Sequence, residues 1–171
     1  MENTSNSNSH SHFGSGSNSD SDKKEFLSGR MSGQIETDIY YEDTDLSGFV
    51  YHANYLKYFE RAREHIIGVT YLRDLYDKGL HFVVSKAELT YLAPLRHADR
   101  LLVESEGMFS RSPAIPFIQK AYKKTAGKKE LVAEGKITIV ALNKSHRPVK
   151  MPDEALSYFH TRQHLKGENH V

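Results

Sequence analysis

The chain has 171 residues, which is the size of one domain with a short extension. Its formal net charge is +1, so its overall electrostatics do not favour binding to nucleic acid or to an anionic membrane. It contains no cysteine, which excludes disulfides and a thiol nucleophile, and no apolar run approaches the ~20 residues that span a bilayer.

Residues 1–33 are dominated by serine, asparagine, glycine and histidine. Such a segment buries too little apolar surface to offset the entropy lost on ordering, so we expect a disordered tail. It has no hydrophobic core of the signal-peptide type, and a cytoplasmic location is the expectation. The folded domain is then expected over residues 34–160, with a C-terminal tail at 161–171.

A half-buried strand is expected over residues 34–41, followed by a loop at 42–51. One parity of the strand is apolar or β-branched: Ile35, Thr37, Ile39 and Tyr41. From residue 54 the period changes to that of a helix that ends at Gly68. Apolar residues recur on one face of this helix: Tyr55, Phe59, Ala62 and Ile66. Charged residues are placed on the other side: Glu60, Arg61, Arg63 and Glu64.

Four β-like runs follow a second short helix at 71–78. They cover residues 82–92, 100–111, 117–125 and 129–142, and short turn-rich links between them favour antiparallel neighbours. A short helix is expected at 154–159. The order predicts an α+β fold with one helix against one face of a five-stranded antiparallel sheet. Its exposed edge and uncovered apolar surface favour self-association.

The loop at 42–51 carries the candidate chemistry. Asp45 can supply a nucleophile or a general base, and the helix that follows can offer backbone N–H groups to a developing oxyanion. The alternative for Asp45 is an Asx turn that only holds the loop. Asp43 suits loop hydrogen bonding, and the absence of further oxygen ligands at convincing spacing argues against a metal. Asn54 is expected to cap the helix or to fix the loop.

The run YYEDTDLSGFVYHANYLKYFERAR at positions 40–63 resembles the active-site segment of hotdog-fold thioesterases of the 4-hydroxybenzoyl-CoA thioesterase-like family. It is most similar to the short-chain acyl-CoA thioesterase branch associated with the bacterial Tol–Pal gene cluster, and weaker resemblance continues to about residue 160. The resemblance implies a hotdog fold, in which the sheet wraps a long central helix. It also implies pairing of domains into a homodimer or homotetramer.

The resemblance implies that Asp45 is the catalytic carboxylate, acting on a thioester carbonyl. It also implies a part for His52, through its backbone N–H or its imidazole, with a partly buried structural histidine as the alternative. Tyr51 and Tyr55 are candidates to line an acyl pocket, although an aromatic residue beside a helix start is more often core.

Coenzyme A requires basic partners for its phosphates. Related thioesterases carry basic residues at the turn that corresponds to Arg111 and Ser112. A basic run surrounds the next turn: Lys123, Lys124, Lys128 and Lys129. A solvated charged hairpin is the alternative interpretation of this run.

The expected function is that of an acyl-CoA thioesterase, which hydrolyses short-chain or aromatic acyl-CoA to a free acid and coenzyme A. No cofactor is implied. The alternative is a non-catalytic hotdog module that binds acyl-CoA or acyl-carrier protein. A hotdog dehydratase is disfavoured because the Asp45–His52 loop differs from the arrangement that those enzymes need.

Overall fold

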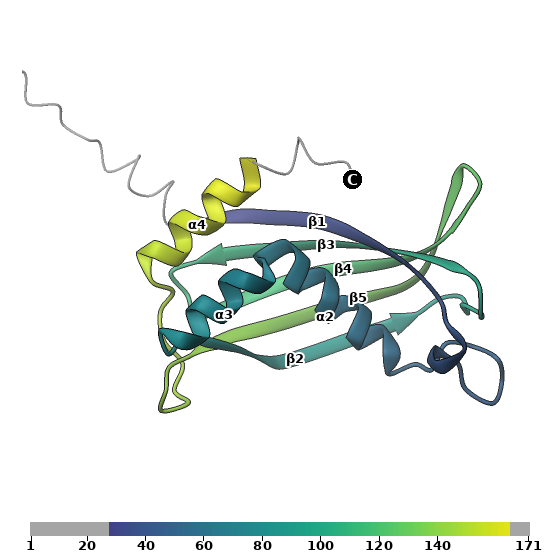
Figure 1. The fold of residues 1–171 in the computed structure, drawn as a ribbon, viewed down its shortest axis with the longest axis horizontal. Coiled ribbons are helices and arrows are strands. Elements are labelled where there is room, and N and C mark those ends of the chain that lie inside the picture. The colour runs from purple at the N-terminus through teal and green to yellow at the C-terminus, as the bar shows by residue number, and fades with distance from the viewer. Residues whose placement is uncertain (1–27, 165–171) are drawn as a thin grey trace, which may run out of the picture.

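A computed structural model describes residues 28–164, with side chains to residue 162, and contains a five-stranded antiparallel sheet, whose arrangement with the helices can be followed in Figure 1. Its spatial order is β1-β3-β4-β5-β2, so β1 and β2 are the edges. The strands are β1 (Ser28–Asp38), β2 (His81–Tyr91), β3 (Arg100–Ser110), β4 (Ala114–Thr125) and β5 (Lys128–Leu142). Both the number of strands and their antiparallel pairing confirm the prediction.

Helices α2 (Asn54–Ile67) and α3 (Val69–Asp77) lie over one face of the sheet, and α4 (Asp153–His164) lies beside the start of β1 (Figure 1). The predicted stop of α2 is confirmed: Gly68 follows it with a φ of +97°, a backbone conformation that favours glycine. The α+β class with a central helix against the sheet is therefore confirmed. No helix within residues 28–164 is long and apolar enough to cross a membrane.

The core lies between the strands and the helices that cover them, in one cluster under α2 and a second that also includes residues of α3 and α4. Phe59 and Ala62 are completely buried, as the helical period predicts. Arg63 was expected on the exposed side but is also buried, with 7% of its surface exposed. Its Nη1 donates to Oε1 of Gln119 on β4 over 2.7 Å. The interpretation of Arg63 as a surface residue was wrong, because Gln119 on the sheet provides a buried hydrogen-bond acceptor for its guanidinium. Helical periodicity cannot show that such a partner exists.

Strand β1 begins at Ser28, so the expected boundary of the folded domain at residue 34 was wrong. Residues 28–33 pair with residues 105–110 of β3, and Met31 is 4% exposed. Gly29 is required there, since a Cβ at this position would lie 2.5 Å from the ring of Phe109. Residues 28–33 are mostly serine and glycine, so they show no alternation of apolar and polar side chains from which a strand could be predicted. The remainder of the expected tail, residues 1–27, lies outside the described residues.

Deleting residues 1–33 should destabilise the domain. It removes six strand residues and the buried side chain of Met31, whose burial alone contributes about 2 kcal/mol. Deleting only residues 1–27 is the matched control and should leave the melting temperature unchanged, as their composition predicts. Thermal unfolding followed by circular dichroism compares the two. Equal melting temperatures for both truncations would contradict the prediction.

Other boundaries also differ from the sequence analysis, among them the end of β1, which is Asp38 and not residue 41. Strand β4 begins at Ala114, although Pro116 lacks an N–H. The proline is tolerated because pairing with β3 ends at the Gly107–Phe117 pair, so residues 114–116 pair only with β5. Helix α4 continues to His164, so residues 161–164 are helical and are not part of a tail. Residues 165–171 lie outside the described residues.

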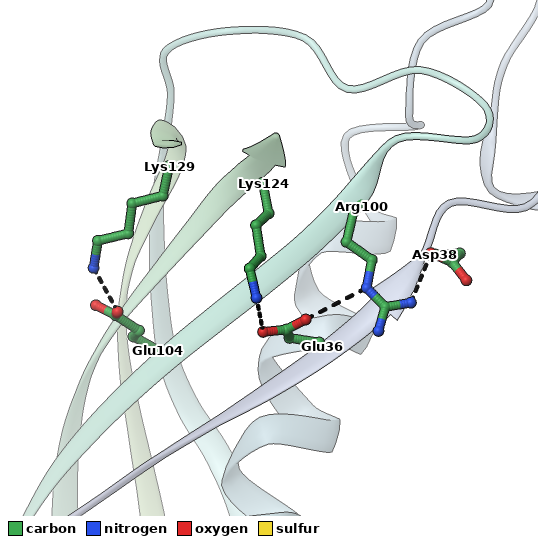
Figure 2. Close-up of polar contacts among 6 residues, drawn as sticks. All are labelled: Glu36, Asp38, Arg100, Glu104, Lys124 and Lys129. Carbon is green, nitrogen blue, oxygen red and sulfur yellow. Dashed lines mark hydrogen bonds and ion pairs between the residues drawn. The ribbon is translucent and has the colours of Figure 1, made fainter. Parts of the chain in front are cut away.

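Ion pairs join four strands near the end of the sheet that leads into the loop after β1 (Figure 2). Glu36 accepts from both Arg100 and Lys124, and Lys129 pairs with Glu104 over 2.6 Å. Such half-exposed pairs contribute about 0–1 kcal/mol each. Three lysines of the basic run are thereby paired with acids: Lys123, Lys124 and Lys129. Most of the charge of this hairpin is therefore neutralised within the protein.

Candidate active site

The loop after β1 contains a narrow hairpin over residues 44–50, called the Asp45 hairpin. The N–H of Asp45 donates to the carbonyl oxygen of Phe49 over 2.9 Å, and the carbonyl of Asp45 accepts the N–H of Gly48 over 2.9 Å. Gly48 has a φ of +75°, which lets the turn close. Thr44 and Val50 form an antiparallel bridge. The backbone therefore holds Asp45 in one fixed place ahead of α2.

The hairpin is attached to the core through Val50. The N–H of Val50 donates to the carbonyl of Leu95 over 2.8 Å, and both side chains are buried. On the surface the guanidinium of Arg96 lies over the ring of Phe49, with 4.4 Å from Cζ to the ring centroid. The hairpin is thus fixed to Leu95 and Arg96, in the segment that connects β2 to β3.

Asp45 is exposed, and its two carboxylate oxygens differ. Oδ1 accepts the N–H of Ser47 over 2.8 Å and also a short hydrogen bond from its hydroxyl. No hydrogen bond among the described residues uses Oδ2. The Ser47 hydroxyl and N–H, with smaller contributions from the N–H of Phe49 and the charge of His52, hold the pKa of Asp45 below its ordinary value of 3.8. The Asx turn is therefore present, and it leaves one oxygen of an ionised carboxylate open.

Asp43 and Asn54 fix the base of the hairpin. The Oδ2 of Asp43 accepts the N–H of Tyr40 over 2.9 Å. Its carbonyl oxygen accepts both the N–H of Tyr51, over 2.9 Å, and Nδ2 of Asn54, over 3.0 Å. Asn54 is 6% exposed and is the first residue of α2, whereas Ala53 is the N-cap. Of the two roles expected for Asn54, the structure shows the loop-fixing one.

His52 and Ala53 form the turn that enters α2. The N–H of Asn54 closes this turn on the carbonyl of Tyr51 over 2.8 Å. Within residues 28–164, no hydrogen bond is made by the N–H of His52 or of Ala53. The carbonyl of His52 accepts the phenol hydroxyl of Tyr91 over 2.9 Å. Two adjacent backbone donors therefore remain open at the positive end of the helix dipole.

Aromatic rings surround this turn, but they differ in exposure. Tyr51 is 45% exposed, and its ring centroid lies 4.4 Å from that of His52. Tyr55 is only 3% exposed, and burial raises its pKa to about 12. Tyr55 therefore belongs to the core under the site, while Tyr51 stands at its surface. The sequence analysis missed Tyr91, because alternation in a strand does not show where a hydroxyl reaches.

Arg111 and Ser112 lie far from Asp45 within one chain. They occupy the turn between β3 and β4, where Arg111 pairs with Asp153 of α4 over 2.6 Å. The Asp45 hairpin contacts Leu95 and Arg96, which precede the other end of β3, and the 11 residues of that strand span roughly 33 Å. A single chain therefore does not bring these two groups of residues together.

Comparison with known proteins agrees with this architecture. A model of the thioesterase-like superfamily matches residues 40–159. The chain is 37% identical over 131 residues to the acyl-CoA thioesterase YbgC of Haemophilus influenzae, a match that covers 75% of this chain and 92% of that protein. It is 32% identical over 120 residues to the acyl-CoA thioester hydrolase YbgC of Escherichia coli O6:H1, with 69% and 84% covered.

Solved structures share the fold. The DHNA-CoA thioesterase from Staphylococcus aureus superposes with a TM-score of 0.68 over 82% of this chain and 96% of that one, at 20% identity. The family model and the YbgC relatives confirm the resemblance that the segment at 40–63 indicated. The chain therefore belongs to the thioesterase-like superfamily and has its hotdog fold, with the Asp45 hairpin leading into the central helix.

Proposed function

We propose that this protein hydrolyses acyl-CoA thioesters, with Asp45 as the catalytic carboxylate. The observation that carries the proposal is the open Oδ2 of Asp45, held by a rigid hairpin directly ahead of the unpaired N–H groups of His52 and Ala53. A thioester carbonyl between them would meet an attacking group and two oxyanion donors. The names of the YbgC relatives, which are acyl-CoA thioesterases, support this choice of substrate.

Two routes use the same oxygen. As a general base, Oδ2 takes a proton from water while the water oxygen bonds to the thioester carbon. The tetrahedral intermediate then breaks its C–S bond, and the proton passes to the departing thiolate. As a nucleophile, Oδ2 itself bonds to the carbon and expels the thiolate, and water then hydrolyses the mixed anhydride. Both routes give a free acid and coenzyme A, and both need Asp45 ionised, which its lowered pKa provides.

The remaining assignments depend on assembly. Arg111 and Ser112 can reach the nucleotide of a substrate at Asp45 only if a second subunit supplies them. Short-chain or aromatic acyl groups remain the proposed substrates, with Tyr51 at the surface of the site. Acyl-carrier protein as a partner and a cytoplasmic location stay predictions from the sequence.

A thiol-release assay with acyl-CoA substrates tests the function. Chains of several lengths and a benzoyl group should be compared, with release of free coenzyme A as the readout. Turnover that saturates with at least one acyl-CoA is the expected result. Saturable binding of acyl-CoA without thiol release would instead identify the non-catalytic binding module.

We expect a homodimer or homotetramer that forms through β2. This edge strand exposes Val83 and Val84, by 39% and 52%, and within residues 28–164 it pairs only with β5. Light scattering at micromolar concentration should give at least a dimer mass. Val84→Glu should shift the mass towards the monomer, whereas Val69→Glu, a matched change on exposed α3, should not. A wild-type monomer with full activity would refute the prediction.

A further inference from the structure

Tyr91 joins the edge of the sheet to the entry of the central helix. It is the last residue of β2, and its hydroxyl donates to the carbonyl oxygen of His52 over 2.9 Å. Its ring meets the ring of His52 edge-on, with centroids 6.4 Å apart, and that of Tyr55 at 5.4 Å. The contact therefore has both a polar and an apolar part, and it spans two separate elements of the fold.

The acceptor of this hydrogen bond is part of the proposed oxyanion site. The carbonyl of His52 and the N–H of Ala53 belong to one peptide group, so a hydrogen bond to the oxygen draws electron density from the nitrogen. Hydrogen bonds in a chain polarise one another in this way, and the N–H becomes a stronger donor. The same contact also fixes the plane of the peptide, and hence the direction of that N–H.

The helix does not provide this restraint by itself. The hydrogen bonds of α2 begin one residue later, where the carbonyl of Ala53 accepts the N–H of Leu56 over 3.2 Å. Within residues 28–164, the hydroxyl of Tyr91 is the only donor to the carbonyl of His52. The net contribution of one such hydrogen bond to folding stability is small, because it replaces a hydrogen bond that the hydroxyl makes to water in the unfolded chain. The hydrogen bond from Tyr91 therefore adds little to folding stability, but it is well placed to orient the His52–Ala53 peptide.

We propose that Tyr91 is a positioning residue for hydrolysis, which orients and polarises the His52–Ala53 peptide so that its N–H binds the developing oxyanion. The proposal rests on the proposed thioesterase function. Because the oxyanion carries more negative charge than the ground-state carbonyl, the stronger donor acts mainly on the transition state. Tyr91 therefore acts on kcat more than on KM.

The test is Tyr91→Phe in the full-length chain, which removes the hydroxyl and keeps the ring. With the best acyl-CoA of the thiol-release assay, we expect kcat to fall about 3- to 10-fold while KM and the melting temperature stay close to wild type. Tyr76→Phe is the matched control, because Tyr76 is an exposed tyrosine on α3, and its kcat should equal that of wild type. Light scattering confirms that all variants have the same mass.

A second measurement does not depend on turnover. In ¹⁵N-labelled protein, loss of the hydrogen bond to the His52 carbonyl should move the amide resonance of Ala53 upfield in Tyr91→Phe and not in Tyr76→Phe. An unchanged kcat in the Tyr91→Phe variant would overturn the proposal. Tyr91→Leu, which also removes the ring, is a further comparison: if kcat falls in Tyr91→Leu but not in Tyr91→Phe, the ring and not the hydroxyl matters, and the proposal is overturned as well. If the wild-type protein releases no thiol, the proposed thioesterase function is refuted, and with it the role of Tyr91 in hydrolysis. The Ala53 resonance then reports only on the hydrogen bond.

Discussion

Asp45→Asn should lower kcat about 100-fold or more, which corresponds to roughly 3 kcal/mol in the activation barrier. The substitution is nearly isosteric, and its amide oxygen can still accept the N–H and hydroxyl of Ser47. It replaces the open carboxylate oxygen by an amide nitrogen that can neither take a proton from water nor attack a carbonyl. The fold and the hairpin should therefore survive while the chemistry is lost.

Affinity should change much less than the rate in this variant. The mutation removes a negative charge from beside an anionic ligand and deletes no packing. Because the pKa of Asp45 lies below 3.8, the carboxylate is ionised throughout the neutral range, and the loss should be the same at pH 6 and at pH 8. Steady-state thiol release at both pH values measures it.

Asp43→Asn is the internal control for this experiment. Asp43 holds the hairpin mainly through its carbonyl oxygen, which the substitution does not touch, and an asparagine oxygen can still accept the N–H of Tyr40. Its effect on kcat should be clearly smaller than that of Asp45→Asn. The assignment fails if folded Asp45→Asn protein hydrolyses its best substrate near the wild-type rate, or if Asp43→Asn proves the more damaging change.

Gln119→Leu should destabilise the fold by about 3 kcal/mol. Gln119 is completely buried on β4 and holds three groups of the core together. Its oxygen accepts Nη1 of Arg63 over 2.7 Å, and its Nε2 donates to the carbonyl of Phe59 over 2.8 Å and to the hydroxyl of Ser105. Leucine fills similar space and leaves all three without that partner, including a buried guanidinium.

Two further variants isolate the cause. Gln34→Leu makes the same change at an exposed position of β1 and should stay within about 0.5 kcal/mol of wild type. Arg63→Met combined with Gln119→Leu should recover part of the loss, because it removes the unpaired charge. Urea unfolding at one fixed protein concentration, followed by circular dichroism, gives each free energy of unfolding. A double variant that is no more stable than Gln119→Leu would show that Arg63 is not the cause.

Local pattern was enough for most of the architecture. The apolar recurrence from Tyr55 to Ile66 and the glycine at 68 predicted α2, whose bounds are Asn54–Ile67. Alternation and turn residues predicted every strand. These signals work because a helix or strand that buries one face must repeat its apolar residues at the period of its own geometry.

The same reasoning failed where stability comes from distant partners. The start of β1 is serine and glycine, and it is ordered by pairing with β3 and by packing of Gly29 against Phe109. Arg63 lies among charged neighbours on its helix, but the buried Gln119 on β4 accepts its guanidinium. Neither the start of β1 nor the burial of Arg63 is visible in the periodicity of apolar residues along the chain.

By itself, the sequence determined the fold class, the central helix and the loop that carries Asp45, because each depends on residues close together in the chain. Only the tertiary structure decided which groups meet. It set Tyr91 of β2 against the carbonyl of His52, and it placed Arg111 at the opposite end of the sheet from Asp45. The physical reason is that strand order and register bring together residues far apart in the chain, and no periodicity in the sequence encodes those distances.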